Sequence, residues 1–211
     1  KLAEKATEVF GVKRSQMLFT NGSDEILNFA FMAFCDAEHG AVFPEISYGF
    51  YEVFAHLDGI KYKKIPLNSD FSIHPSDYYN AGGMVVIANP NAPTGRCLEV
   101  CEIEEIVKSN PKNVVLIDEA YIDFAGTSAR TLIDRYDNLL VIQTFSKSRS
   151  MAGARLGFGA GNAQLIRDLN TIKYSTNPYN INSMTMAAGL GTMLDDEYTL
   201  KNCKTVAENR E

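Results

Sequence analysis

Three stretches of the chain are almost uninterruptedly apolar, and each has the length of one buried strand. They are GMVVIANP at 83–90, NVVLIDEAY at 113–121 and NLLVIQTF at 138–145. Between the first two, LEVCEIEEIVKS at 98–109 places apolar residues at helical spacing with its acidic residues outward. Because strands that are apolar on both sides need cover on both faces, the pattern predicts a mostly parallel sheet between helices.

The other periodic segments fit the same architecture. SDEILNFAFMAFC at 23–35 predicts a helix whose N-cap is Ser23 or Asp24, and its first acidic residues suit the positive end of a helix. Further strands are predicted at 41–46 and 60–67, and further helices at 2–12, 48–59 and 195–211. We therefore predict an α/β fold, a three-layer sandwich with a mostly parallel mixed sheet. The 211 residues, 45% of them hydrophobic, suffice for one sizeable core.

Charge and composition remove several classes of function. Twenty basic and 26 acidic residues give a net charge of −6 without a basic run, which argues against nucleic-acid binding. No apolar stretch reaches the roughly 18 residues of a membrane span and no signal-peptide pattern opens the chain, so we predict a cytoplasmic protein without a membrane partner. Cys97 and Cys101 are four residues apart, but no histidine completes a tetrahedral set. We predict no metal site.

Polar side chains follow the ends of three predicted strands. Asn89 and Asn91 follow the first strand, Asp118 and Tyr121 the second, and Ser146 and Lys147 the third. Ligands of such sheets bind beyond the carboxyl ends of the strands, so we expect these side chains to face one crevice.

Taken alone, each of these groups has an ordinary interpretation. Asp118 follows VVLI, where a buried carboxylate must be paired, and a cap or a loop ion pair would suffice. Tyr121 fits a core aromatic whose hydroxyl is satisfied. A lysine that ends a strand is usually solvated, yet crowding of Lys147 near Arg149 and Arg155 disfavours the charged form and favours a nucleophilic amine.

Two further features predict an anion site. Arg155 follows the small residues SMAGA, and its planar fork suits a phosphate, although a surface ion pair is the alternative. TNGSDE at 20–25 places backbone N–H groups at the start of a helix.

One ligand accounts for all these groups together. Pyridoxal phosphate needs an amine for its aldehyde, a carboxylate for its pyridine nitrogen, a donor for its phenolate oxygen and several donors for its phosphate. Lys147 and Asp118 meet the first two needs. The phosphate donors would be Thr144, Ser146, Arg155 and the backbone amides of Gly22, Ser23 and Asp24.

The motifs NGSDEIL, SYGFY, NPNAPTG, DEAYIDF and TFSKSRSMAGARLGF, in this order, resemble the fold-type-I pyridoxal-phosphate aminotransferases across nearly the whole chain. The histidinol-phosphate aminotransferases are the most similar branch. The resemblance implies that Lys147 carries the cofactor, that Tyr48 stacks on its ring and that Arg155 binds its phosphate. It assigns Asp118 and Tyr121 to the cofactor as well.

One position departs from the family pattern. The signature often reads NPNNPTG, and its second asparagine commonly contacts the phenolate oxygen, whereas this chain has Ala92 there. Either Asn91 takes over that contact or Tyr121 serves the oxygen alone.

The resemblance implies transamination between a small-molecule amino donor and a keto acid. Histidinol phosphate with glutamate and 2-oxoglutarate, in histidine biosynthesis, is the expected substrate set. Two alternatives stay open: another enzyme of this fold, such as an aromatic aminotransferase or a threonine-phosphate decarboxylase, and a regulator that senses pyridoxal phosphate.

The chain opens and closes inside amphipathic helix patterns, so we expect an internal piece of a longer protein. The resemblance implies that residues 1–194 form the cofactor-binding large domain and that residues 195–211 begin a C-terminal small domain. It also implies a homodimer of the full-length protein. The arginine that binds the substrate carboxylate or phosphate would lie in the missing part, so the piece alone is expected to be inactive or nearly so.

Overall fold

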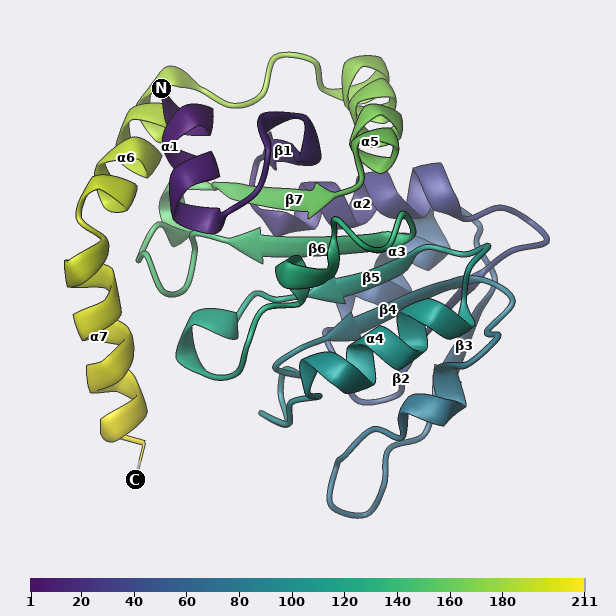
Figure 1. Cartoon of the computed structure of the whole chain (residues 1–211). Coiled ribbons are helices and arrows are strands. Elements are labelled where there is room, and N and C mark those ends of the chain that lie inside the picture. Colours follow the sequence, from purple (N-terminus) through teal and green to yellow (C-terminus); the bar gives the residue numbers. More distant parts are fainter. Residues whose placement is uncertain (211) are drawn as a thin grey trace.

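Seven strands form one mixed sheet in the order β1-β7-β6-β5-β4-β2-β3 (Figure 1). The computed structural model describes residues 1–210. The strands are β1 Met17–Thr20, β2 Ala41–Pro44, β3 Tyr62–Ile65, β4 Met84–Ala88, β5 Val115–Asp118, β6 Leu139–Thr144 and β7 Gly157–Gly161. Strands β3, β2, β4, β5 and β6 run parallel, while β7 is antiparallel to both β6 and β1.

Helices cover both faces of this sheet. They are α1 Leu2–Phe10, α2 Ser23–Phe34, α3 Phe50–Leu57, α4 Val100–Ser109, α5 Ala163–Thr176, α6 Ser183–Leu194 and α7 Asp196–Glu208. Short 3₁₀ turns are η1 Arg14–Gln16, η2 Pro75–Tyr78, η3 Ile122–Phe124, η4 Ala129–Leu132 and η5 Ala152–Ala154. The predicted three-layer α/β sandwich is thereby confirmed.

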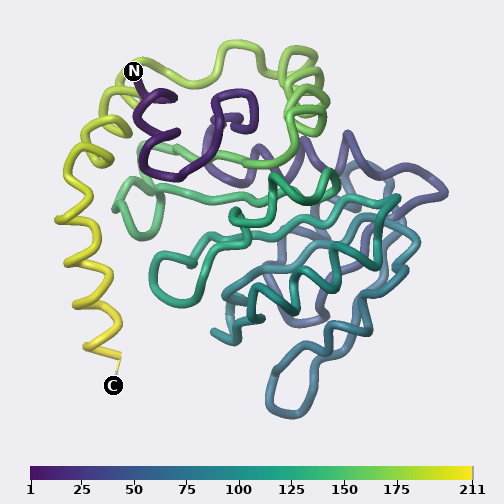
Figure 2. Tube along the Cα trace, viewed as in Figure 1, coloured from purple at the N-terminus to yellow at the C-terminus, as the bar shows by residue number. Residues whose placement is uncertain are grey.

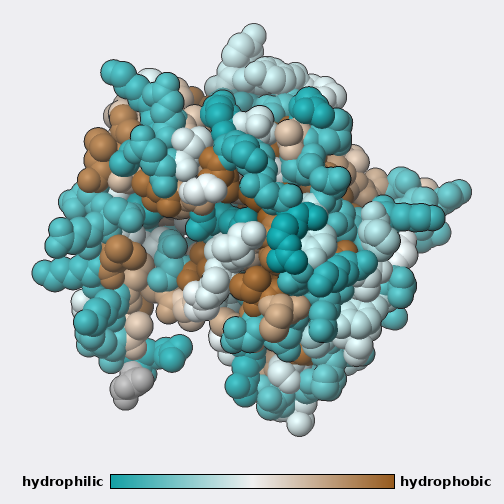
Figure 3. All heavy atoms as spheres, in the orientation of Figure 1, coloured by the Kyte–Doolittle hydropathy of each residue, from teal (hydrophilic) through white to brown (hydrophobic). Residues whose placement is uncertain are grey.

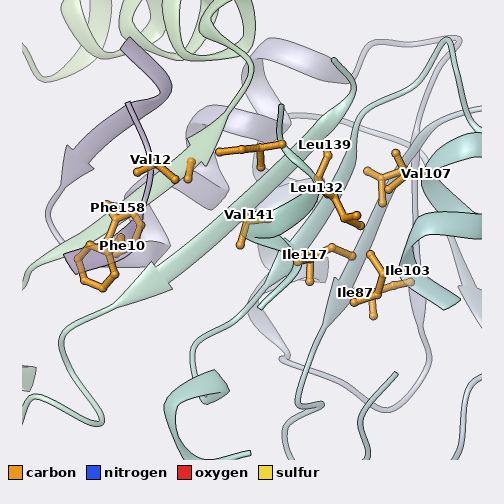
Figure 4. Close-up of a cluster of buried hydrophobic side chains, with 14 of the residues drawn as sticks. Phe10, Val12, Ile87, Ile103, Val107, Ile117, Leu132, Leu139, Val141 and Phe158 are labelled. Atoms are coloured by element: carbon orange, nitrogen blue, oxygen red, sulfur yellow. The ribbon is translucent and has the colours of Figure 1, made fainter. Parts of the chain in front are cut away.

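Two apolar clusters fill the space between the layers. One joins α1, α4 and η4 to the sheet through residues such as Phe10, Ile103 and Leu132 (Figure 4). The other joins α2, α3 and α5 to the opposite face. Along β5, Ile117 belongs to the first cluster and Leu116 to the second, because successive side chains of a strand point to opposite faces.

The antiparallel border of the sheet was not predicted from the pattern. Strand β7 reads GFGAG, and glycine is depleted in strands, so no strand signal stands out there. The glycines are needed for close packing: a Cβ on Gly157 would lie 2.5 Å from the Gly22 carbonyl carbon and from the Ser23 nitrogen. The N-cap of α2 is also different from the prediction, because Gly22, not Ser23 or Asp24, occupies it with φ 77°.

Helices α6 and α7 continue the chain along one edge of the molecule, where they are coloured yellow-green and yellow in Figure 2. Helix α7 packs mainly against η3 and α6. Among residues 1–210, none of the helices combines the length and the apolar character that crossing a membrane requires.

Candidate active site

A cleft opens beyond the carboxyl ends of β4, β5 and β6. Its lining comes from six separate segments of the chain: Ser23, Asp24, Tyr48, Ala88, Pro90, Ala92, Asp118, Ala120, Tyr121, Thr144, Ser146, Lys147, Ala152 and Arg155. The register explains the convergence, because Asp118 pairs with Ala88 on one side and with Ile142 on the other. Nine of the eleven residues predicted for the site therefore line one cavity.

Asp118 lies at the buried base of this cleft. Its Oδ2 accepts a hydrogen bond from the Tyr51 hydroxyl at 2.8 Å, and its Oδ1 accepts one from the backbone N–H of Ala120 at 3.1 Å. Burial raises the pKa of the Asp118 carboxyl to about 6, although both hydrogen bonds oppose that rise. A cation bound next to this carboxylate would lower its pKa again and so offset the effect of burial.

Lys147 and Tyr121 border the cleft together. The ammonium nitrogen Nζ of Lys147 lies 5.2 Å from the centre of the Tyr121 ring. The predicted crowding by two arginines is only partly seen, because the Arg149 guanidinium binds α6 and α7 instead of lining the cleft. Lys147 is exposed to the cavity, as an amine that reacts with a ligand must be.

The anion site is built where the start of α2 meets Arg155. A Cβ on Gly22 would lie 2.5 Å from the Arg155 nitrogen Nη2, so only glycine lets the guanidinium lie against this backbone. Arg155 donates to the Asp24 carboxylate at 3.1 Å and to the Ala152 carbonyl oxygen at 3.2 Å. A guanidinium has five N–H donors, which leaves several for an incoming anion.

Hydroxyl groups complete this side of the cleft. Thr144 donates to the Ser146 hydroxyl at 2.9 Å and accepts from the Ser146 backbone N–H at 3.2 Å. The Tyr48 hydroxyl donates at 2.9 Å to Asp24, the carboxylate that also pairs with Arg155. The Tyr48 ring is half-buried and meets the Tyr51 ring edge-on at 5.6 Å between centroids.

The structure does not bring Asn91 to the surface of the cleft. Its side chain accepts from Ser47 at 2.8 Å and donates to the Ile46 carbonyl oxygen at 3.0 Å and to Thr94 at 2.9 Å. Both N–H groups of its amide are therefore used, and no donor is left for a phenolate oxygen. Of the two residues considered in place of Ala92, Tyr121 lines the cleft and Asn91 does not.

Two other groups lie elsewhere than expected. Asn89 is buried and exchanges hydrogen bonds with the backbone of Leu98, so it holds the loop instead of facing the crevice. Gly22 is buried beside the cleft, and its backbone N–H donates to the Thr20 carbonyl oxygen at 2.9 Å, so this predicted anion donor is already engaged.

Sequence reasoning missed Tyr51 and Glu119. Tyr51 lies three residues after Tyr48 on the buried face of α3, and a buried hydroxyl needs a partner, which was the available signal. Glu119 points to the opposite face from Asp118, where it accepts from Ser128 at 2.5 Å and from the Ala129 N–H at 2.6 Å. Burial raises the pKa of the Glu119 carboxyl. Its contacts anchor η4 and it does not line the cleft.

Solved structures share the fold of this chain. The histidinol-phosphate aminotransferase from Clostridium acetobutylicum has a TM-score of 0.84 at 26% identity, with 96% of this chain and 61% of that chain covered. The enzyme from Sinorhizobium meliloti in complex with pyridoxal-5'-phosphate has a TM-score of 0.90 over 99% of this chain and 58% of that one; at 19% identity it shows the fold alone. The chain therefore has the fold of these aminotransferases.

The chain belongs to the family of class I and II aminotransferases, whose model matches residues 1–211. Among curated proteins, the histidinol-phosphate aminotransferase of Brachyspira hyodysenteriae is 47% identical over all of this chain and 60% of its own length. That of Lactococcus lactis subsp. cremoris is 43% identical over 100% of this chain and 59% of its own. The chain thus spans about 60% of the length of the curated relatives it matches.

Proposed function

We propose that the whole protein is a pyridoxal-phosphate-dependent aminotransferase that binds its cofactor in this cleft. The observation that carries the proposal is the convergence of an exposed amine, a buried carboxylate and an arginine-lined anion site on one cavity. The glycine at position 22 supports the fit, because any side chain there would displace Arg155.

Each part of the cofactor has a counterpart among the residues of the cleft. Lys147 would hold the aldehyde carbon, Asp118 would face the pyridine nitrogen, and Tyr121 would donate to the phenolate oxygen. Tyr48 would cover one face of the ring. The phosphate would be held by Thr144, Ser146, Arg155 and the backbone amides of Ser23 and Asp24, whose position at the start of α2 suits an anion.

The roles of these side chains in catalysis follow from their chemistry. When bound, pyridoxal phosphate supplies an electron-accepting ring next to the substrate Cα. Asp118 keeps a proton on the ring nitrogen by its negative charge, which the hydrogen bonds from Tyr51 and Ala120 stabilise. The Lys147 amine would serve as the general base that takes the proton from the substrate Cα.

We propose histidinol phosphate as amino donor and 2-oxoglutarate as acceptor, in histidine biosynthesis. The support is the identity of 43–47% to curated histidinol-phosphate aminotransferases. The same family includes other substrate classes, so the substrate side chain is the part of the proposal that needs direct measurement.

The domain division and the homodimer are also proposals. Residues 1–194 would form the large domain and residues 195–211 the start of a small one. Figure 3 shows brown atoms among teal ones along the rim that α6 and α7 form on the left. Large apolar side chains that are exposed from α5 through α7 would suit cover by further protein: Tyr174, Tyr179, Met184, Met186, Leu194, Tyr198, Leu200 and Val206.

We also propose a cytoplasmic location for the protein. The free thiols of the four cysteines fit a reducing compartment.

The full-length protein, supplied with histidinol phosphate and 2-oxoglutarate, is expected to produce glutamate in a pyridoxal-phosphate-dependent reaction. Parallel reactions with aromatic amino acids and with threonine phosphate separate the alternatives, since a decarboxylase releases carbon dioxide and an aminopropanol phosphate. The protein would not be a histidinol-phosphate aminotransferase if one of these substrates reacted at a much higher kcat/KM than histidinol phosphate.

A further inference from the structure

Arg149 lies only two residues after Lys147, yet its side chain points away from the cleft. Its side chain is 6% exposed, so the guanidinium is buried in the protein on the side of α6 and α7. Burying such a charge is costly unless it is paired and hydrogen-bonded, so a buried arginine without a part in ligand binding needs an explanation.

The contacts of this guanidinium join three separate parts of the chain. It donates to the Thr192 carbonyl oxygen at 3.0 Å and to the Asp196 carboxylate at 2.7 Å. Thr192 lies in the last turn of α6, where carbonyl groups lack a partner within the helix, and Asp196 lies in the first turn of α7. The Arg149 Cζ also lies 5.5 Å from the ring centre of Phe10 and 5.4 Å from that of Phe145.

The segment that carries Lys147 is held by further contacts next to Arg149. The hydroxyl of Ser148 donates to the Asp123 carboxylate, which follows the DEAY motif. The backbone N–H of Ser150 donates to the Lys147 carbonyl oxygen at 3.1 Å, which closes a turn directly after the lysine. Figure 1 shows this connection between β6 and β7 beside α6 and α7.

We propose that Arg149 is a positioning residue, which fixes the turn of Lys147 against the junction of α6 and α7 through its ion pair with Asp196. This inference rests on the proposed function of Lys147 as the cofactor-binding amine. The Arg149–Asp196 ion pair connects the turn that carries Lys147 to the junction of α6 and α7. A displacement of α7 would therefore loosen that turn.

The side chain must be an arginine for this role. Its planar group stacks on two aromatic rings and donates to two acceptors at the same time, whereas a lysine ammonium keeps the charge without this fork. We therefore expect a graded series, in which Arg149→Lys is intermediate and Arg149→Met, which keeps the apolar bulk alone, has the full effect.

The test follows two properties of the purified full-length protein. The first is the rate at which visible absorbance develops when pyridoxal phosphate is added, which reports covalent attachment to Lys147. The second is the affinity for inorganic phosphate by calorimetry, which reports the anion site and the fold around it. Arg149→Met and Asp196→Asn are expected to slow attachment by about 10- to 100-fold, since a shift of 1 Å in a reacting group has effects of that size. Phosphate affinity should stay as in wild type.

Control variants separate this role from a general loss of stability. Arg135→Met removes an exposed guanidinium paired with Glu104 and is expected to behave like wild type. Asp196→Asn should add no further slowing to Arg149→Met, because the two residues act as one pair. Attachment at the wild-type rate in Arg149→Met, or a parallel loss of phosphate affinity, would overturn the inference. If the wild-type protein itself showed no absorbance, the proposed function would fail instead.

Discussion

Replacement of Lys147 by alanine is expected to abolish the visible absorbance of the protein mixed with pyridoxal phosphate. Lys147 is the one amine that lines the cleft among residues 1–210, so no neighbouring lysine can replace it there. Non-covalent binding through Arg155 and the amides of α2 should persist, because the variant leaves those donors in place. An absorbance titration together with equilibrium dialysis measures the two effects separately.

Lys63→Ala is a matched control, since Lys63 is exposed on β3, far along the sheet from the cleft. It should keep the full absorbance of the wild type. Survival of the band in Lys147→Ala would show that another amine holds the cofactor.

Replacement of Asp118 by asparagine is expected to impair catalysis while it stabilises the cofactor-free protein. Asparagine cannot offset the positive charge of the facing ring nitrogen. Removal of one partner of a buried charge pair costs about 3–5 kcal/mol, which corresponds to a loss of roughly 10²- to 5 × 10³-fold in kcat. Steady-state kinetics of the loaded full-length enzyme measure this loss.

The stability gain follows from the raised pKa of the Asp118 carboxyl. Its pKa rises from 3.8 to about 6 on folding, so the folded state binds the proton more tightly than the unfolded state does. The carboxyl therefore lowers the free energy of unfolding progressively between these two pH values, and the full penalty is present above about pH 6. Asp118→Asn should raise the free energy of unfolding by up to about 3 kcal/mol at pH 7.5 and leave it nearly unchanged at pH 3.5.

Urea unfolding of the cofactor-free protein at the two pH values measures this difference. Asp77→Asn serves as control, because Asp77 is exposed and its substitution should change stability little at either pH. A destabilised Asp118→Asn variant at pH 7.5 would mean that the hydrogen bonds from Tyr51 and Ala120 outweigh the effect of burial.

The parallel half of the sheet and its cleft could be predicted because they depend on local pattern. The apolar runs that became β4, β5 and β6 each end in polar residues, and parallel strands bring such ends to one edge. Strand β7 could not be predicted in this way, because its glycines serve the approach of Gly157 to the backbone of Gly22 and Ser23. The two segments that must approach each other are more than 130 residues apart in sequence, so no local stretch of sequence indicates their contact.

The same distinction applies to the side chains of the site. Asp118 and Lys147 were predictable from their chemistry and their place at the end of a strand, and Arg155 from its chemistry after a run of small residues. The hydrogen bonds from Tyr51 to Asp118 and from Ser47 to Asn91 join segments that are distant in sequence, so they emerged only from the structure. Arg149 is the clearest example, because its place near Lys147 in sequence favoured the cleft, whereas its buried side chain pairs with the partly exposed Asp196.

The central claim is that the amine of Lys147, the carboxyl of Asp118 and the anion site at Arg155 bind a single molecule of pyridoxal phosphate. Borohydride reduction of the loaded full-length protein, followed by peptide mapping with mass spectrometry, tests it directly, since reduction fixes the cofactor to the amine that holds it. We expect one cofactor per chain, on the peptide that contains Lys147. A label on a different lysine, or one spread over several surface lysines, would contradict the account.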